Sequence, residues 1–352
     1  MPRSCQPAHA GECSRQGRPV PRRDTEREEK MRTIGKAAAS AAFAVAIGSA
    51  AHAQDNVTIG AASVGGTYYV WAGGLANVLS QAGMDANVEV TGGPLHNIQL
   101  VDAGEMQLGL STAAPAYEGF NGIEWADGEE YDNIRAVLPM YPSFFTWWSL
   151  ETSGIESFQD LDGNVVAMGP TGGTPDTYGR VVYEQTGVTP SRMVNAGFSD
   201  IVNLLRDGQI DAAFTTAGLP HPAVAENEST DPINLITLPP EISRAFIEEY
   251  PYFGTGIVPA GTYEAVTEDQ ETLTVWNFLI TNADMPDDTV YEIVKAVFEN
   301  QDAMIEAHPA SRYVQLENVG EITIPLHPGA LRYYEEQGVE IPDRLRGDGS
   351  GS

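Results

Sequence analysis

The fold is decided by a stretch that occurs twice, as IGAASVGGTYY at residues 59–69 and as VVAMGPTGGTP at residues 165–175. Each copy begins with a short apolar run, which is typical of a buried parallel strand. A glycine turn containing Gly-Gly-Thr follows, and a helical pattern begins directly after it. The repeat therefore predicts two strand–turn–helix units of one design.

A second pair of similar segments lies downstream of these units. GEMQLGLST at residues 104–112 matches GQIDAAFTT at residues 208–216. The two glycine turns are 107 residues apart and these two segments are 104 residues apart, so order and spacing both repeat. This period predicts two α/β lobes rather than a short-period solenoid. Because open α/β sheets bind ligands where strands end and helices begin, we expect a cleft between the lobes that closes on a small molecule.

The first 53 residues are predicted to be a leader that is removed. A basic start at residues 31–36 precedes an apolar run at residues 37–47, and the small-x-small sequence AHA supplies a cleavage site after Ala53. Residues 1–30 lack apolar periodicity, so we expect Met31 to be the true start. The apolar run is too short for a membrane anchor. These features predict a periplasmic protein without stable membrane insertion; an Ala-rich surface helix is the alternative.

Composition narrows the possible partners. Cys5 and Cys13 both lie in the leader, so the exported chain has no thiol, disulfide or Cys-based metal site. Nine of the 19 Lys and Arg and five of the 49 Asp and Glu also lie there, which leaves a net charge of −34. Such charge excludes nucleic acid as a partner and disfavours anionic lipid surfaces. Because it repels itself unless salt screens it, we expect a halophilic protein; an acidic protein of ordinary salinity is the alternative.

Apolar periodicity places the other elements along the chain. Strands are expected at residues 57–61, 88–90, 108–110, 134–140, 144–150, 165–168, 210–214 and 235–238. Helices are expected at residues 70–81, 95–103, 176–186, 200–207, 241–250, 285–300 and 327–337. Residues 111–115 are expected to form a loop after the third strand.

The chain is expected to cross between the two lobes twice. The aromatic strand at residues 144–150 should cross into the second lobe, and the chain should return near residues 251–260. The predicted domains are lobe 1 at residues 54–148 and 255–345, lobe 2 at residues 149–254, and a flexible tail at residues 346–352. Because successive residues of a strand face opposite sides, at most one of Trp147 and Trp148 should face the cleft.

The order of short motifs is similar to that of the TAXI family, the extracytoplasmic solute receptors of TRAP-type secondary transporters. The resemblance covers residues 57–339. It is carried by GGTYY at 65–69, TGG at 91–93, GEMQL at 104–108, GPTGGT at 169–174, DGQIDA at 207–212, residues 257–263, AHP at 307–309 and IPLHPGA at 324–330.

This resemblance implies a function as well as a fold. It implies an α/β type II periplasmic binding protein with two lobes, no enzymatic activity, no cofactor and a TRAP membrane permease as partner. The receptor is expected to be a monomer. Relatives bind glutamate, glutamine and related small carboxylates. For this chain, 2-oxoglutarate is a further candidate. The sequence STAA at residues 111–114 replaces the Gln-Ser-Asp of many relatives, so the exact ligand stays open.

The glycine turns are the main candidates for ligand binding. Glycine lets backbone N–H groups approach a ligand, and a helix N-terminus carries about half a positive charge, so the pair suits a carboxylate. A turn needed only for strand–helix packing is the alternative. The predicted ligand-binding residues are Gly66, Thr67, Tyr68, Thr91, Gly92, Gly93, Asn97, Ser111, Thr112, Tyr141, Thr171, Gly172, Gly173, Thr174, Thr215 and Thr216.

Other reactive side chains show no pattern for catalysis. No Ser-His-Asp order with a nucleophile elbow occurs, and the histidines lack metal-site spacing, so no catalytic or metal-binding residue is predicted. Arg180 is expected to form a surface ion pair, and His221 is expected to be structural. An enzyme on the same fold is therefore disfavoured, whereas a sensor that feeds a membrane kinase would share every feature.

Overall fold

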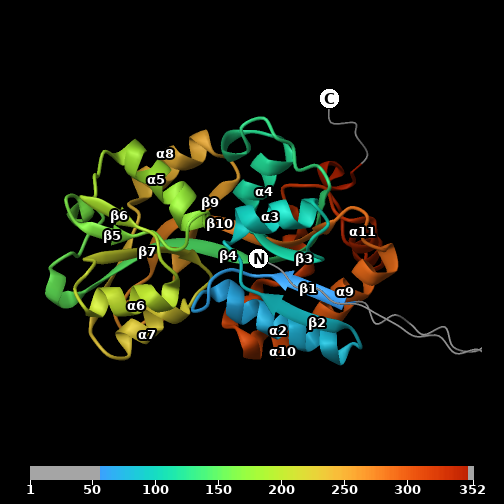
Figure 1. Cartoon of the computed structure of the whole chain (residues 1–352), viewed down its shortest axis with the longest axis horizontal. Helices are drawn as coiled ribbons and strands as arrows, with labels where there is room; N and C mark the ends of the chain where they lie inside the picture. The colour runs from blue at the N-terminus through green and yellow to red at the C-terminus, as the bar shows by residue number, and fades with distance from the viewer. Residues whose placement is uncertain (1–55, 348–352) are drawn as a thin grey trace, which may run out of the picture. The chain divides into compact units, whose positions relative to one another are not determined.

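The computed structural model describes residues 56–347. Its ten strands form one mixed sheet with helices packed on both faces (Figure 1). The predicted leader (residues 1–53) and the end of the predicted tail (residues 348–352) lie outside the described residues. Between residues 56 and 347, no helix is long and apolar enough to cross a membrane.

The first glycine turn follows the central strand of a group of three parallel strands, named here the first strand group. The central strand pairs with both neighbours, so that Ile59 lies opposite Val88 on one side and Leu108 on the other. Ile59 and Leu108 are fully buried, as the apolar runs predict. The elements in chain order are β1 (Asn56–Gly60), α2 (Thr67–Gln81), β2 (Asp85–Glu89), α3 (Pro94–Asp102) and β3 (Leu108–Thr112).

The second glycine turn belongs to an equivalent arrangement, named here the second strand group. Its central strand is again parallel to both neighbours, with Val166 opposite Met193 and Ala212. The repeat in the sequence is therefore a repeat of topology. The elements are β5 (Val165–Ala167), α5 (Thr174–Thr186), β6 (Arg192–Val194), α6 (Phe198–Arg206), β7 (Ala212–Ala217) and α7 (Pro222–Glu228).

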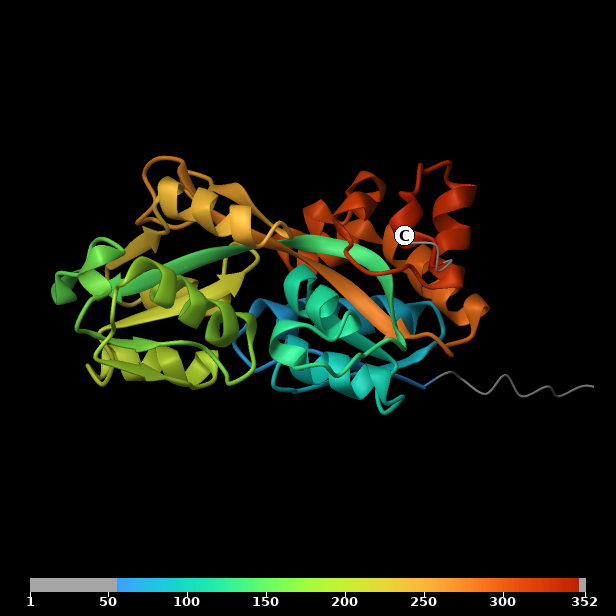
Figure 2. The same ribbon diagram turned by 90° about the horizontal axis from the view of Figure 1, so that it is seen from above.

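Two long antiparallel strands connect the groups (Figure 2). Early in its length, β4 (Ile134–Leu150) pairs with β10 (Gln270–Asn282), and beyond Phe144 it pairs with β7 and with β8 (Ile233–Thr237). Strand β10 pairs first with β9 (Phe253–Val258) and then with β3. The prediction of two strands at 134–140 and 144–150 is wrong, and β10 has no counterpart among the predicted elements.

Proline explains why the sequence suggests an interruption in β4. Pro142 has no N–H group to donate, which normally argues against a central strand. In the structure Pro142 lies opposite Trp276, next to a shift in the register between β4 and β10. The missing donor therefore coincides with a position where the ladder is already irregular, and the strand continues through it.

The aromatic residues of β4 form the core of the second strand group. Trp147 stacks on Phe214 at 4.1 Å between ring centroids and donates its indole N–H to Tyr183 at 2.8 Å. Trp148 donates to the Asn227 side chain at 2.9 Å. Both tryptophans are fully buried and satisfied, so both serve packing.

The remaining helices cover the ends and faces of the sheet. Helix α10 packs closely on α2, where a Cβ on Gly74 would lie 2.5 Å from the Ala307 side chain. The loop predicted at residues 111–115 is wrong, because a helix begins at Ala113; Pro115 falls in its first turn, where a missing N–H costs nothing. These helices are α4 (Ala113–Phe120), α8 (Pro240–Glu249), α9 (Asp287–Glu299), α10 (Gln301–Ala307) and α11 (Pro328–Glu336).

Candidate functional site

A small cavity of about 50 Å³ lies where the two strand groups meet. A single water needs about 10–15 Å³ of such space, so the cavity has room for a small molecule but not for a peptide or a nucleotide. Both glycine turns contribute to it. The lining residues are Ala62, Gly66, Thr67, Tyr68, Gly93, Pro94, Thr112, Pro170, Gly173, Thr174, Pro175, Phe198, Thr216, Ala217, His221 and Asn277.

Three helices begin at this cavity. The first residues of α2, α3 and α5 are Thr67, Pro94 and Thr174, and all three line it. A glycine precedes each helix, and none of these glycines can cap the helix with a side chain. Three partial positive charges therefore converge on one small space, and that of α5 is partly offset by Asp176 in its first turn. This arrangement favours a negatively charged guest.

The glycine loop before α3 closely approaches the second glycine turn. Gly93 has φ +103°, a backbone conformation that other residues rarely adopt. A Cβ placed on it would lie 3.5 Å from the Cα of Gly173. Glycine at position 93 thus meets a torsional requirement and keeps room between the loops.

Hydroxyl groups connect the strand groups across the cavity. The hydroxyl of Thr112, at the end of β3, shares a hydrogen bond of 3.0 Å with that of Thr174, at the start of α5. Thr67 donates to the Gly218 carbonyl at 3.2 Å, and Ser199 donates to the Val64 carbonyl at 3.3 Å. The two strand groups are therefore in direct contact around the cavity.

An amide from β10 orders one wall. Asn277 accepts a hydrogen bond of 2.6 Å from the Tyr68 hydroxyl, and its amide nitrogen donates to the Tyr141 carbonyl and to the Ser143 hydroxyl. Burial, and then the proximity of Tyr141, raise the pKa of Tyr68 well above its usual value. Tyr68 is therefore a neutral donor, and its position is fixed by Asn277.

His221 is the least satisfied side chain of the lining. It is fully buried against the Phe198 ring, and neither ring nitrogen has a hydrogen-bond partner among residues 56–347. Burial, and then the proximity of His308, lower its pKa to about 3, so the imidazole is neutral near pH 7. The Thr216 hydroxyl is likewise buried without a partner in the described part of the chain. Unpaired buried groups carry a cost that a ligand would remove.

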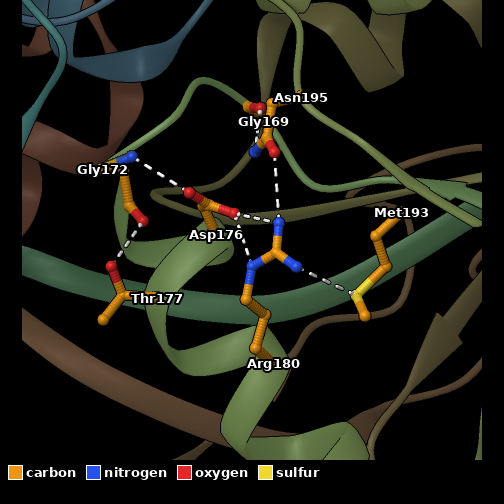
Figure 3. Close-up of polar contacts among 8 residues, drawn as sticks. Gly169, Gly172, Asp176, Thr177, Arg180, Met193 and Asn195 are labelled. Atoms are coloured by element: carbon orange, nitrogen blue, oxygen red, sulfur yellow. Dashed lines mark hydrogen bonds and ion pairs between the residues drawn. The ribbon is translucent and has the colours of Figure 1, made fainter.

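The second glycine turn is held by an ion pair, as Figure 3 shows. Asp176 accepts from the Gly172 N–H at 3.1 Å through one oxygen and from Arg180 at 2.7 and 2.9 Å through the other. Arg180 also contacts the Asn195 amide oxygen at 3.1 Å. Arg180 therefore forms an ion pair, as predicted, but its partner Asp176 is buried rather than at the surface. Arg180 is not among the lining residues of the cavity.

The structure brings half of the predicted site residues to the cavity. The predicted residues that line it are Gly66, Thr67, Tyr68, Gly93, Thr112, Gly173, Thr174 and Thr216. The predicted residues that lie outside the lining are Thr91, Gly92, Asn97, Ser111, Tyr141, Thr171, Gly172 and Thr215.

Several of the residues outside the lining support it. Asn97 donates to the carbonyls of Gly60, Ala61 and Leu110, which ties α3 to β1 and β3. Thr91 accepts from the Gly93 N–H at 3.1 Å and so orders the loop before α3. The Asn97 amide nitrogen and the Thr91 hydroxyl thus serve local structure, whereas the Asn97 amide oxygen is buried without a partner among the described residues.

Sequence reasoning missed other lining residues. Asn277 lies on β10, which was not predicted, and Phe198 begins α6. His221 was expected to be structural, yet it lines the cavity and follows the carboxyl end of β7. Its position a few residues after a repeated strand is a signal that could have indicated a place at the cavity. No group of three or more His, Cys, Asp or Glu suited to a metal ion occurs within residues 56–347.

Comparisons with known proteins agree with this architecture. The model of the NMT1-like family matches residues 59–338. A structure described as a periplasmic transporter is 15% identical and covers 74% of this chain and 88% of its own, with a TM-score of 0.51. The periplasmic binding protein BugD is 15% identical and covers 82% of this chain and 99% of its own, with a TM-score of 0.50.

A third similar structure is MatC from Rhodopseudomonas palustris with bound malate. It is 13% identical and covers 73% of this chain and 88% of its own, with a TM-score of 0.51. Likeness at such low identity establishes the fold alone. The predicted two-lobe α/β fold of type II periplasmic binding proteins is thus confirmed.

Proposed function

Because the chain belongs to the NMT1-like family, whose model covers residues 59–338, we propose that it is a periplasmic solute receptor for a transporter. It captures a small carboxylate by closing two lobes around the cavity between the strand groups. The observation that carries this proposal is the convergence of the N-termini of α2, α3 and α5 on one small cavity. Such a space favours an anion that contacts both lobes, and contact with both is what shifts the population toward the closed state.

The lobe boundaries belong to the same proposal. Lobe 1 comprises residues 54–148 and 255–345, and lobe 2 comprises residues 149–254. The change of partners along β4, from β10 to β7 beyond Phe144, supports a crossing near the proposed boundary. The two long strands act as the hinge.

The membrane partner is proposed from the resemblance in the sequence. A TRAP-type permease receives the solute from the closed, monomeric receptor. The candidate solutes are glutamate, glutamine and dicarboxylates such as 2-oxoglutarate. The test reconstitutes in vesicles a permease that is encoded beside this chain. Transport of only the ligand of this receptor would support the assignment. Transport in the absence of the receptor would contradict it.

Binding is tested directly by calorimetry on protein expressed from the full sequence. The titrants are small carboxylates and amino acids, at low and at molar salt, together with mass spectrometry of any molecule that co-purifies. We expect one small carboxylate to bind at micromolar concentration or better. A co-purified ligand without an acidic group, or binding of none of the carboxylates, would refute the proposal.

A further inference from the structure

We infer that the cavity selects small carboxylic acids that carry no ammonium group, and so rejects amino acids. This inference rests on the proposed function and narrows its substrate class. It follows from the charged groups that surround the cavity. The lining contains no Asp, Glu, Lys or Arg within the described residues.

An ammonium group would find no countercharge in this space. Moving a charge out of water is costly unless an opposite charge or several acceptors surround it. Glu118 and Asp176 are the two acidic side chains that are buried in the described part of the chain, and neither lines the cavity. Both oxygens of Asp176 are already occupied, one by Gly172 and the other by Arg180 (Figure 3).

Neutral acceptors in and beside the lining already take part in bonds between elements. The Asn277 amide oxygen accepts from Tyr68, and the Gly218 carbonyl beside the cavity accepts from Thr67. The hydroxyls of Thr112 and Thr174 bind each other. An ammonium group, which has three N–H donors and no acceptor, would compete with these bonds. The acceptors that are left, one ring nitrogen of His221 and the Thr216 oxygen, are neutral and supply no countercharge.

A carboxylate meets the opposite situation. The first turns of α2 and α3 contain no acidic residue, so their N-termini are not neutralised. His221 offers one ring N–H and Thr216 one hydroxyl, and both groups lack a partner among residues 56–347. Because His221 is fully buried in the lining, it is positioned as a neutral donor to an oxygen of the guest.

The rest of the lining suits a short carbon skeleton. Phe198 and three prolines supply apolar contact area around the polar edge. Apolar atoms of a guest gain free energy there, whereas an added ammonium group would be desolvated without a countercharge. The expected ligand is thus a short carboxylate with an unsubstituted, hydroxyl- or oxo-bearing chain.

The test uses pairs of acids that differ at the α-carbon. Wild-type protein is titrated by calorimetry with lactate and alanine, and with 2-oxoglutarate and glutamate. In whichever pair binds more tightly, we expect the acid without an amino group (lactate or 2-oxoglutarate) to have a Kd at least 100-fold lower than that of the corresponding amino acid. An amino acid that binds as tightly as its partner would overturn this inference while leaving the receptor function intact. Absence of binding by all short carboxylates would refute the receptor function as well.

A variant pair tests the donors. Thr216→Val removes the unpaired hydroxyl with little change in volume, and we expect it to raise the Kd of the preferred acid about tenfold. Ser243→Ala removes a hydroxyl on α8 that is equally buried and unpaired in the described structure, and we expect no change in Kd. An unchanged Kd in Thr216→Val, with the melting temperature retained, would contradict the assigned role of Thr216.

Discussion

The carboxyl group of Glu118 should make the stability of the protein depend on pH. Glu118 lies on α4 after the first strand group and is 1% exposed. It accepts hydrogen bonds from Tyr178 on α5 at 2.7 Å and from Tyr252, before β9, at 2.5 Å. Burial raises its pKa to about 7, although both tyrosine hydrogen bonds act in the opposite direction.

The magnitude follows from the difference between the folded and unfolded pKa values. Raising the pKa from 4.5 to about 7, at 1.36 kcal/mol per pH unit, corresponds to about 3 kcal/mol of unfolding free energy. Because the folded protein holds this proton more tightly, the contribution is fully present below pH 4.5. It is lost as the pH rises through about 7, when a charge forms in a buried site.

Glu118→Gln removes this titration and keeps a polar group for both tyrosines. We expect the unfolding free energy of the variant, relative to wild type, to rise by about 3 kcal/mol between pH 4.5 and pH 8.5. The assay is urea denaturation at several pH values in molar salt, which suppresses the background of surface charge. Glu306→Gln, at an exposed position on α10, serves as the control and should follow wild type. Parallel pH profiles for Glu118→Gln and wild type would refute the reasoning.

Three further outcomes are expected. Thr174→Phe fills the cavity, so binding of the preferred acid should disappear in calorimetry while the melting temperature is retained; normal binding would place the site elsewhere. Arg180→Gln leaves Asp176 negative beside the start of α5, so the Kd for a carboxylate should rise about tenfold, with less effect at molar salt. The melting temperature of wild type should increase between 0.1 M and 2 M NaCl, because salt screens the excess of acidic residues; a constant value by calorimetry would exclude the halophilic interpretation.

The repeated glycine turns were sufficient to predict the fold class. Both turns encode strand and helix locally, so β1, α2, β5 and α5 lie within a few residues of their predicted bounds. Strand β10 was not predicted, because its residues 273–280 pair with distant segments of β3, β4 and β9 and carry no turn signal of their own. The break expected in β4 was wrong because tertiary pairing tolerates Pro142.

The candidate site was predictable where it depends on local sequence. Gly66, Thr67, Gly173 and Thr174 belong to the repeat itself, and all four line the cavity. A single histidine such as His221 gives no spacing pattern. It enters the lining because the segment after β7 is brought next to α6, which depends on long-range packing.

The irregular pairing beside Pro142 has a consequence for ligand exchange. At this level of the proposed hinge two prolines of β4 lack an N–H donor, Pro142 opposite Trp276 and Pro139 opposite Phe278, and the register shifts between them. Torsion concentrated at this level would allow the lobes to part while the neighbouring rungs of the ladder stay intact. The solute would then be released by bending at this level of the two strands rather than by local unfolding. Substitutions that change the rate of ligand exchange could therefore leave the stability of the fold unchanged.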